Sequence, residues 1–272
     1  MPKSALPLMT PADLSTPSGN PPCAPRTEID CLTALAHELR TPLSAILGMA
    51  ELLENAEDLQ KVRRQSGVIR ESALTMHTIL DEMFDYARIR AENAPPSKMA
   101  PFDPAALLAE LNDRFAIQAR AAGIDFLTDP PDSLPERLIG DALRTGQALT
   151  NLLTLALKLT PRGEIRLTIR FLPASHETIR LRCEIRASGN GLNNHQCKAL
   201  FKPLSSGHQS LPGFPYGSGF GPAIAKGWIG LMAGSLRIRC RPEKGALFRI
   251  EIPFCHSIID IDEKLTTLPH VC

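Results

Sequence analysis

A histidine, a carboxylate and a hydroxyl lie close together near the start of the chain, in the stretch LAHELRTPL over residues 35–43. Glu38 follows His37 directly and could hold one nitrogen of the imidazole ring, which would leave the other free to act as a nucleophile. Thr41 lies four residues after His37, so on a helix its hydroxyl would share the same face. Pro42 removes a backbone donor and bends a helix just beyond this position. An isolated histidine is most often an ordinary surface residue, but these neighbours favour nucleophilic chemistry at His37.

Apolar or small residues around His37 recur at alternating three- and four-residue spacing, which predicts an amphipathic helix over residues 27–56. The same pattern predicts a second helix over residues 59–91. With Leu32 at heptad position a, His37 falls at position f, the point furthest from the apolar seam, and therefore faces solvent. One hairpin cannot cover both seams, whereas two hairpins can pair as a four-helix bundle, so we expect a homodimer. A plain structural coiled coil is the alternative interpretation. The seam positions are Leu32, Leu35, Leu39, Pro42, Ile46, Met49 and Leu53, then Val62, Ser66, Ile69, Ala73, Met76, Leu80, Met83 and Ala87.

The composition of the chain argues against several classes of partner. The formal net charge is +1 and the sequence pI is about 7.6, which does not favour binding to nucleic acid or to an anionic membrane. The longest apolar run, over residues 223–233, is interrupted by Lys226 and is too short to span a bilayer. No signal peptide is recognisable at the N-terminus, so we expect a cytoplasmic protein. The 7 cysteines are scattered without a Cys-x-x-Cys pair, and we interpret them as reduced thiols and expect no metal site.

Proline-rich breaks divide the chain into segments, and the fold class we predict is α+β. A helical hairpin should be followed by an α/β sandwich, in which helices pack on an antiparallel-leaning sheet. Helices are expected over residues 105–122, 140–159 and 221–233, and strands over 124–128, 164–171, 178–187, 235–241 and 246–253. The segments are a disordered Pro/Ser-rich leader (1–26), the dimerisation domain with His37 (27–93), a linker (94–104), the sandwich domain (105–254) and a loosely attached tail (255–272).

The block HELRTPL resembles the phosphoacceptor box of two-component sensor histidine kinases. The second domain is similar to the ATP-binding domain of the same proteins, whose fold is shared with DNA gyrase, Hsp90 and MutL. Three stretches carry this second resemblance: GDALRTGQALTNLL over residues 140–153, LFKPL over 200–204 and GSGFG over 217–221. The resemblance implies that a phosphoryl group passes from ATP, with Mg²⁺, to His37, and then to an aspartate on a response-regulator receiver domain. The leader carries no recognisable input domain, so any signal is expected from an upstream sensor protein.

The resemblance also assigns roles to individual residues. His37 would be the phosphoacceptor, with Glu38 and Thr41 as its catalytic neighbours. On the ATP side, Asn151 corresponds to a helix-packing asparagine, and Lys158 could contact a phosphate. The family has two glycine boxes, which correspond here to residues 185–192 and 217–221, and their glycines would bind the nucleotide through backbone amides. These glycines are Gly189, Gly191, Gly217, Gly219 and Gly221.

The chain departs from the family pattern at two informative positions. Leu155 stands where the family has its magnesium-coordinating asparagine, and leucine offers no oxygen ligand. Ala187 stands where an aspartate accepts a hydrogen bond from the adenine amino group, and losing a buried acceptor costs about 1–3 kcal/mol. Ser188 is one residue out of register and should face away from the nucleotide.

Three hypotheses about function follow from these residues. In the leading one, His37 exchanges a phosphoryl group with a receiver domain, by phosphotransfer or by dephosphorylation, and the autokinase activity is weak or lost. In the first alternative, the protein is an active ATP-dependent kinase that uses Asn151 and Lys158 in unusual roles. In the second, it is a non-enzymatic dimeric scaffold that binds a receiver domain without using His37.

Overall fold

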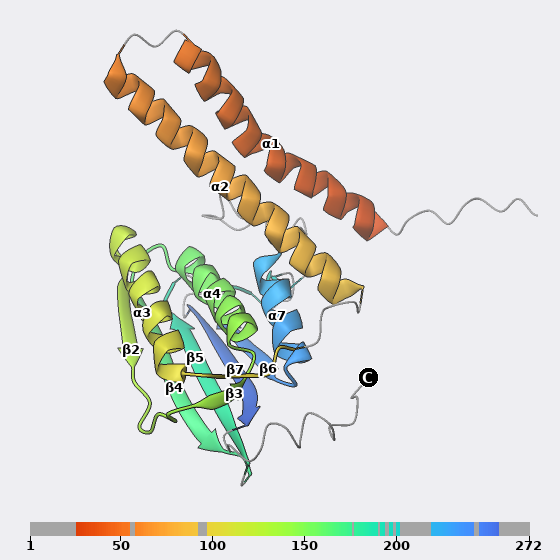
Figure 1. The fold of residues 1–272 in the computed structure, drawn as a ribbon, viewed down its shortest axis with the longest axis vertical. Coiled ribbons are helices and arrows are strands. Elements are labelled where there is room, and N and C mark those ends of the chain that lie inside the picture. The colour runs from red at the N-terminus through yellow and green to blue at the C-terminus, as the bar shows by residue number, and fades with distance from the viewer. Residues whose placement is uncertain are drawn as a thin grey trace, which may run out of the picture.

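The computed structural model describes residues 26–54, 58–91, 97–175, 177–189, 191–193, 196–197, 200–201, 219–241 and 245–255. Two long helices form a hairpin that extends from a compact α/β half (Figure 1). The expected leader and tail lie outside the described residues, apart from Arg26 and Cys255, which are the ends of regular elements. Within the described ranges no helix combines the length and the apolar character that crossing a bilayer requires.

The hairpin consists of α1 (Arg26–Glu54) and α2 (Leu59–Arg90), as the heptad pattern predicts. Asp58 begins α2 because its side-chain Oδ1 accepts a hydrogen bond of 2.9 Å from the backbone N–H of Gln60. Pro42 lies inside α1 and is buried. Several large apolar side chains of the hairpin remain exposed in the single chain: Leu43, Leu47, Leu52, Leu59, Leu74 and Phe84.

The second half is built on a 7-stranded sheet of order β1-β3-β7-β5-β4-β2, with β6 paired to β7. The β2–β4 pair is parallel and the remaining pairs are antiparallel. The strands are β1 (Ala100–Phe102), β2 (Asp125–Asp129), β3 (Leu138–Gly140), β4 (Glu164–Pro173), β5 (Thr178–Ala187), β6 (Ser235–Arg241) and β7 (Gly245–Cys255). The helices are α3 (Pro104–Ala121), α4 (Ala142–Leu159) and α7 (Gly221–Leu231).

Two short strands were not expected from the sequence. β1 lies within the stretch expected to be linker, and β3 lies in the loop before α4. They pair with each other, with Pro101 opposite Ile139, at one edge of the sheet. Three residues are too few for a strand to show an alternating apolar pattern, and the proline in β1 argues against a strand except at an edge.

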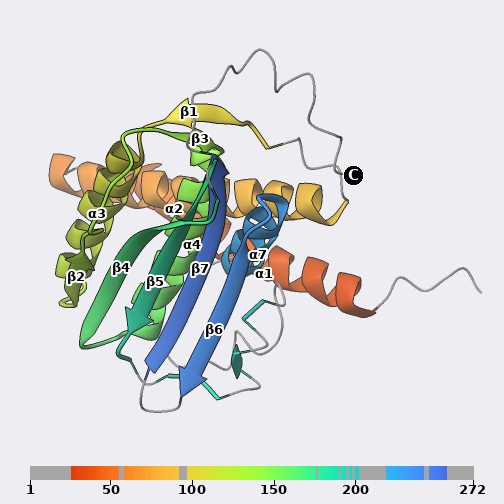
Figure 2. The same cartoon turned by 90° about the horizontal axis from the view of Figure 1, so that it is seen from below.

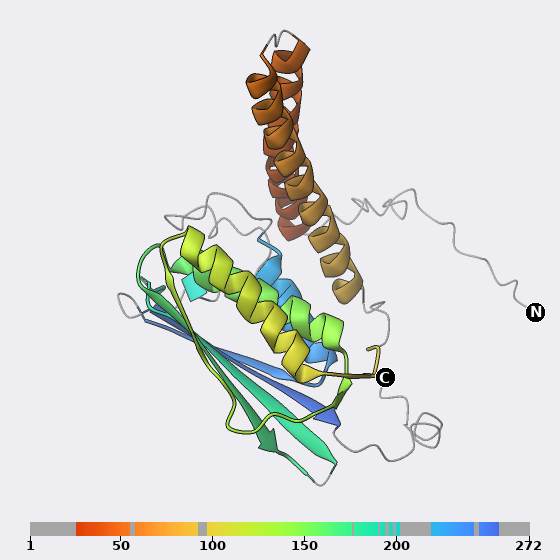
Figure 3. The ribbon, with the colours of Figure 1, turned by 60° about the vertical axis from the view of Figure 1, so that its left-hand side comes forward.

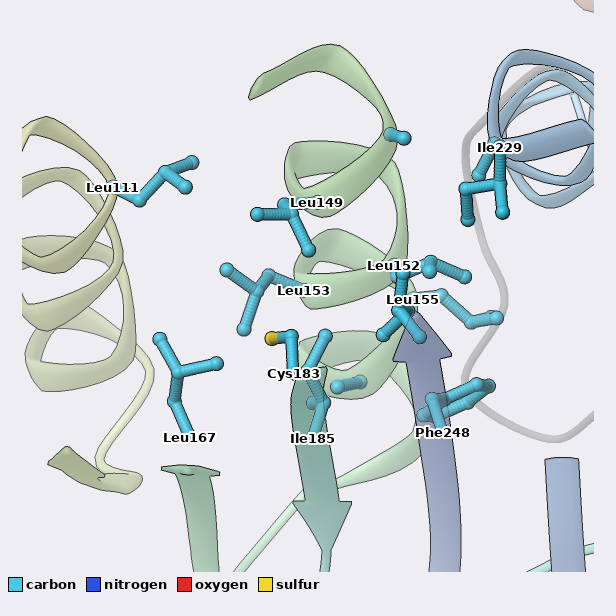
Figure 4. Packing of buried hydrophobic residues seen from close by; sticks show 14 of the residues in the cluster. Leu111, Leu149, Leu152, Leu153, Leu155, Leu167, Cys183, Ile185, Ile229 and Phe248 are labelled. Atoms are coloured by element: carbon cyan, nitrogen blue, oxygen red, sulfur yellow. The ribbon is translucent and has the colours of Figure 1, made fainter. Parts of the chain in front are cut away.

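The sheet is covered on one face by α3, α4 and α7, while its other face is open (Figures 2 and 3). Alternation along the strands explains this arrangement, because one set of side chains is apolar and the other is charged. Leu167, Ile185 and Phe248 point toward Leu149 and neighbouring leucines of α4 (Figure 4). The open face carries arginines joined to carboxylates, for example Arg249 to Glu184 with Nε–Oε1 at 2.7 Å, Arg182 to Glu251 at 2.8 Å and Arg166 to Asp129 at 3.1 Å.

The hairpin packs on the second half through the C-terminal part of α2. The rings of Tyr86 in α2 and Phe220, just before α7, lie 5.1 Å apart between centroids. Ile89 fits against Gly227 of α7, where a Cβ atom would come within 2.6 Å of the isoleucine Cγ2. Glycine at position 227 therefore allows the two helices to approach closely.

Asp141 at the start of α4 ties the linker to the second half. Its Oδ1 accepts from the Arg144 N–H at 3.0 Å, and its Oδ2 accepts from the Lys98 N–H at 2.9 Å and the Ser97 hydroxyl at 3.2 Å. The same Oδ2 lies 3.4 Å from Nε of Arg144. The guanidinium of this buried arginine lies 4.4 Å from the ring centre of Trp228 in α7. A single N-capping carboxylate thus holds together the linker, α4 and, through Arg144, α7.

Candidate functional site

His37 lies on the exposed face of α1, as its heptad position predicts. Leu35 and Pro42, on the other side of the helix, are buried. Thr41 lies one turn further along, and its hydroxyl donates a hydrogen bond of 3.3 Å to the backbone carbonyl of His37. This bond satisfies the threonine hydroxyl inside the helix. The imidazole is therefore accessible to a partner, with the threonine held directly beneath it.

Glu38 takes part in a half-buried charge cluster that includes Glu82 of α2 and Lys158 of α4. Burial raises the pKa of the Glu38 carboxyl to about 7, with Glu82 adding to the rise and Lys158 opposing it. Burial also raises the pKa of Glu82 to about 7, where Lys158 opposes the rise and Asp85 adds a smaller contribution. Burial lowers the pKa of Lys158, and both glutamates oppose that decrease. We call these three residues the Glu38–Glu82–Lys158 cluster.

The residue that follows His37 in the chain therefore carries a carboxyl that titrates near neutral pH. A carboxyl with a pKa of about 7 is half protonated at that pH and can accept or release a proton. One carboxylate oxygen of Glu38, Oε2, is buried and has no hydrogen-bond partner among the described residues. The expected role of Glu38 in orienting the imidazole stays a prediction.

On the nucleotide side, the two departures from the family pattern are both buried and apolar. Leu155 is 2% exposed and lies with Leu152 in the core beneath α4 (Figure 4). Ala187, the last residue of β5, is 1% exposed and pairs with Ile165 of β4 and Ala246 of β7. Neither side chain offers an oxygen or a nitrogen to a ligand.

Ser188 does not replace the missing acceptor. Its hydroxyl oxygen accepts a hydrogen bond of 2.8 Å from the backbone N–H of Glu164, and its own N–H donates to the Glu164 carbonyl. Its side chain also lies against Gly163. The serine is therefore directed toward the start of β4, in agreement with the expectation that it faces away.

The described glycines of the two glycine boxes serve the backbone. Gly189 is buried, and a Cβ atom there would lie 1.9 Å from the Leu159 carbonyl oxygen, so only glycine allows β5 to approach the end of α4. Gly191 and Gly219 have φ angles of +67° and +64°, a conformation that side chains disfavour. Gly221 begins α7, and Gly217 lies outside the described residues.

The structure brings some of the expected ATP-side residues together and separates others. Asn151 lies near Gly221, whose added Cβ would be 3.7 Å from its Oδ1. Asn151 also lines a cavity of about 490 Å³ between α2, α3 and α4. Carboxylates dominate the charged residues of this cavity, which would repel a triphosphate; the charged residues are Asp81, Glu82, Asp85, Glu110 and Arg114. Lys158 lies two turns from Asn151 along α4, in the charge cluster.

Comparison with known proteins agrees with the two halves of this description. Residues 28–92 match the His Kinase A (phospho-acceptor) domain, and residues 140–256 match the histidine kinase-, DNA gyrase B- and HSP90-like ATPase family. The chain belongs to the histidine kinases and forms a transmitter module of two-component signalling.

Individual relatives are larger than this chain. The sensor histidine kinase GacS of Pseudomonas protegens is 32% identical over 229 residues, which are 84% of this chain and 25% of that protein. The aerobic respiration control sensor protein ArcB of Escherichia coli K12 is 28% identical over 84% of this chain and 29% of its own length. The chain thus spans about a quarter of the length of these curated relatives. Among solved structures, full-length ShkA in complex with AMPPNP has a TM-score of 0.61 at 26% identity, covering 85% of this chain and 46% of ShkA.

The contributions of three residues near the candidate site could not be predicted from the sequence. Glu82 flanks a heptad seam and would be taken for a solvated charge, while Tyr86 and Arg144 have no feature that separates them from other helix residues. Their roles depend on where the second half packs on α2, which no local pattern encodes.

Proposed function

We propose that this module exchanges a phosphoryl group between His37 and the aspartate of a response-regulator receiver domain, with an ATP-dependent autokinase that is weak or absent. In the forward step, an imidazole nitrogen attacks the phosphorus of the aspartyl phosphate, a P–N bond forms, and the P–O bond to the carboxylate breaks. Hydrolysis of the aspartyl phosphate is the competing outcome. The exposed His37, with Glu38 adjacent and Thr41 beneath it, supplies the groups for both.

The observation that carries this proposal is the apolar filling at Leu155 and Ala187. A nucleotide site of this family would need a metal ligand and an adenine acceptor at these positions, and both side chains are instead part of the core. Loss of a buried acceptor costs about 1–3 kcal/mol, or roughly one to two decades of affinity. Losing the metal ligand as well should leave binding of Mg-ATP far weaker than in an intact kinase.

Two experiments test the proposal directly. The first incubates the full chain with radiolabelled Mg-ATP, and little or no label should reach His37. The double variant Leu155→Asn with Ala187→Asp should raise nucleotide affinity measured by titration calorimetry. Tight magnesium-dependent binding by the unmodified protein would overturn the autokinase part of the proposal.

The second experiment supplies a receiver domain phosphorylated with acetyl phosphate and follows its label. Label should leave the receiver and appear on the module in acid-labile form, and His37→Ala should abolish this label. Glu38→Ala should impair transfer to and from the imidazole. Thr41→Ala should leave transfer intact and slow only the loss to water. If His37→Ala behaves like the unmodified protein in both transfer and dephosphorylation, the scaffold hypothesis is correct instead.

The active-kinase alternative is favoured by one observation. Gly191 and Gly219 keep the left-handed backbone of the glycine boxes, so a phosphate-binding backbone could remain without its usual side chains. ShkA, which resembles this fold, was solved with AMPPNP. The labelled-ATP experiment distinguishes the two cases, because an active kinase would transfer label to His37 without any receiver.

We also propose that the module works as a homodimer through the hairpin. Several apolar side chains of α1 and α2 are exposed in the single chain: Leu47, Leu74 and Phe84 are 54–63% exposed. A second hairpin would cover them. Light scattering at micromolar concentration should give the mass of a dimer.

The solved complex of the histidine kinase ThkA with the response regulator TrrA is a precedent for the receiver partner. ThkA is similar in fold to this chain, with a TM-score of 0.57 at 22% identity over 84% of this chain and 63% of that chain. An upstream sensor protein would supply the signal, and the cytoplasm, where ATP and receivers meet, is the compartment we propose.

A further inference from the structure

Two cysteines from distant parts of the chain meet beside the first glycine box. Cys197 lies in a turn fixed by a reciprocal pair of hydrogen bonds: the Asn193 N–H donates to Oε1 of Gln196, and the Gln196 N–H donates to Oδ1 of Asn193, both at 2.9 Å. The Cys197 N–H also donates to the Asn193 carbonyl at 2.9 Å. This capping arrangement sets the direction of the cysteine side chain.

Cys240 comes from β6, the strand that pairs with β7. It lies opposite Ala246, in the inward-facing set of side chains that includes Leu236 and Ile238. Its sulfur lies 2.8 Å from the sulfur of Cys197, with one thiol donating to the other. A disulfide bond measures about 2.05 Å, so closing this pair requires the sulfurs to approach by only about 0.8 Å.

We propose that Cys197 and Cys240 form a thiol–disulfide exchange site whose reaction partner is a low-molecular-weight disulfide such as oxidised glutathione. The Cys197 thiolate attacks one sulfur of glutathione disulfide, forming a mixed disulfide and releasing one glutathione thiolate. Cys240 then loses its proton and attacks the Cys197 sulfur, which forms the intramolecular disulfide and releases the second glutathione. Two protein thiols are oxidised and one glutathione disulfide is reduced to two thiols.

The electrostatics of the pair assign the two roles. The hydrogen bond between the two thiols lowers the pKa of Cys197, which favours its thiolate form. The same hydrogen bond, with burial, raises the pKa of Cys240, which therefore remains protonated until the mixed disulfide has formed. Cys197 is only partly buried, so a small disulfide can reach it. An unperturbed thiol with a pKa near 8.5 would be only about 3% ionised at pH 7.

Oxidation would tie the turn that carries Cys197 to β6. The turn of Cys197 begins two residues after Gly191 and leads to Leu200, whose N–H donates to the Gln196 carbonyl at 3.1 Å. The exchange chemistry is a property of the two thiols and does not depend on whether the module transfers phosphoryl groups.

The test uses the full chain with Cys23, Cys31 and Cys272 replaced by serine, so that these three thiols do not take part. The protein is equilibrated with glutathione buffers of graded oxidised-to-reduced ratio, quenched with acid, alkylated and digested. Mass spectrometry should find a peptide pair linked through Cys197 and Cys240, in a fraction that rises with the oxidised share. At pH 7, before oxidation, iodoacetamide should modify Cys197 about tenfold faster than an ordinary exposed thiol.

The protein contains its own controls. Cys183 is fully buried, with its pKa raised to about 12, and should stay unmodified, while the exposed Cys255 supplies the reference alkylation rate. Cys240→Ser should stop the reaction at a mixed disulfide on Cys197, whereas Cys255→Ser should leave the linked pair unchanged. If both cysteines stay alkylatable at every glutathione ratio while Cys255 becomes glutathionylated, the proposal fails. It also fails if Zn²⁺ added to the reduced protein protects both thiols from alkylation while glutathione buffers without Zn²⁺ give no linked peptide.

Discussion

Glu82 should make the stability of the protein fall as the pH rises toward neutrality. Its carboxyl pKa is raised from 4.5 to about 7 in the folded state, mainly by burial. A raised carboxyl pKa means that the folded protein binds the proton more tightly than the unfolded chain does, so the stabilisation is complete below pH 4.5 and is lost as the pH passes through about 7. At about 1.4 kcal/mol for each pKa unit, the loss is roughly 3 kcal/mol.

The variant Glu82→Gln should remove the Glu82 share of this slope while keeping the shape of the side chain, and Glu38, whose pKa is also raised to about 7, should leave a smaller slope in the same direction. Trp228 is the only tryptophan and lies buried on α7 beside α2, so its fluorescence reports on this region during urea unfolding. Between pH 5 and pH 7.5 the shifted pKa of Glu82 alone should cost the unmodified protein roughly 2 kcal/mol of unfolding free energy, and the variant should lose markedly less. Glu71→Gln, at an exposed position of the same helix, should retain the original slope. Equal slopes for the unmodified protein and Glu82→Gln would refute the reasoning.

Three further predictions concern the hairpin, its contact with α7 and the open face of the sheet. His37→Ala should leave the unfolding free energy within about 0.5 kcal/mol of the original, because the side chain faces solvent, and calorimetry checks this. Gly227→Ala should weaken the packing of α7 on Ile89, seen as a shift of the tryptophan emission, whereas Gly230→Ala on the same helix has nothing within 4 Å of its new Cβ and should stabilise the protein by about 1 kcal/mol. Arg237→Thr should raise the thermal midpoint, because Arg237 lies directly opposite another arginine of β7 and such pairs cost about 0.2–1 kcal/mol; an unchanged or lowered midpoint would contradict this.

The elements that could be predicted from the sequence are those whose own pattern matches their surroundings. The heptads of α1 and α2 and the alternation of β4 to β7 arise because each element buries one face, and the predicted ranges agree with the structure to within a few residues. The exposure of His37 follows from the same pattern. The linker strand β1 was missed because its pairing with β3 depends on a distant segment.

The surroundings of the candidate site could not be predicted, because they depend on how the two halves pack. Nothing near Glu38 in the sequence indicates that Glu82 and Lys158 approach it, and the resulting rise in its pKa depends on that burial. Cys197 and Cys240 are likewise separated by 43 positions and look like unrelated thiols in the sequence. Contacts of this kind are set by tertiary packing, which overrides local propensity.

The packing of the two halves bears on how His37 can react. Glu38 and Glu82 interact, so α1 and α2 face each other at the level of His37, and Tyr86 lies one helical turn further along α2, about 6 Å away. Tyr86 contacts Phe220, the residue directly before α7. The N-terminal end of α7, which begins at Gly221, is therefore held against this part of α2. His37 nevertheless remains exposed. The imidazole is therefore accessible while the second half stays packed on α2. Because Lys158 belongs to the second half and Glu38 and Glu82 to the hairpin, this packing also sets the electrostatic surroundings of the residue that follows His37, whether or not the second half binds a nucleotide.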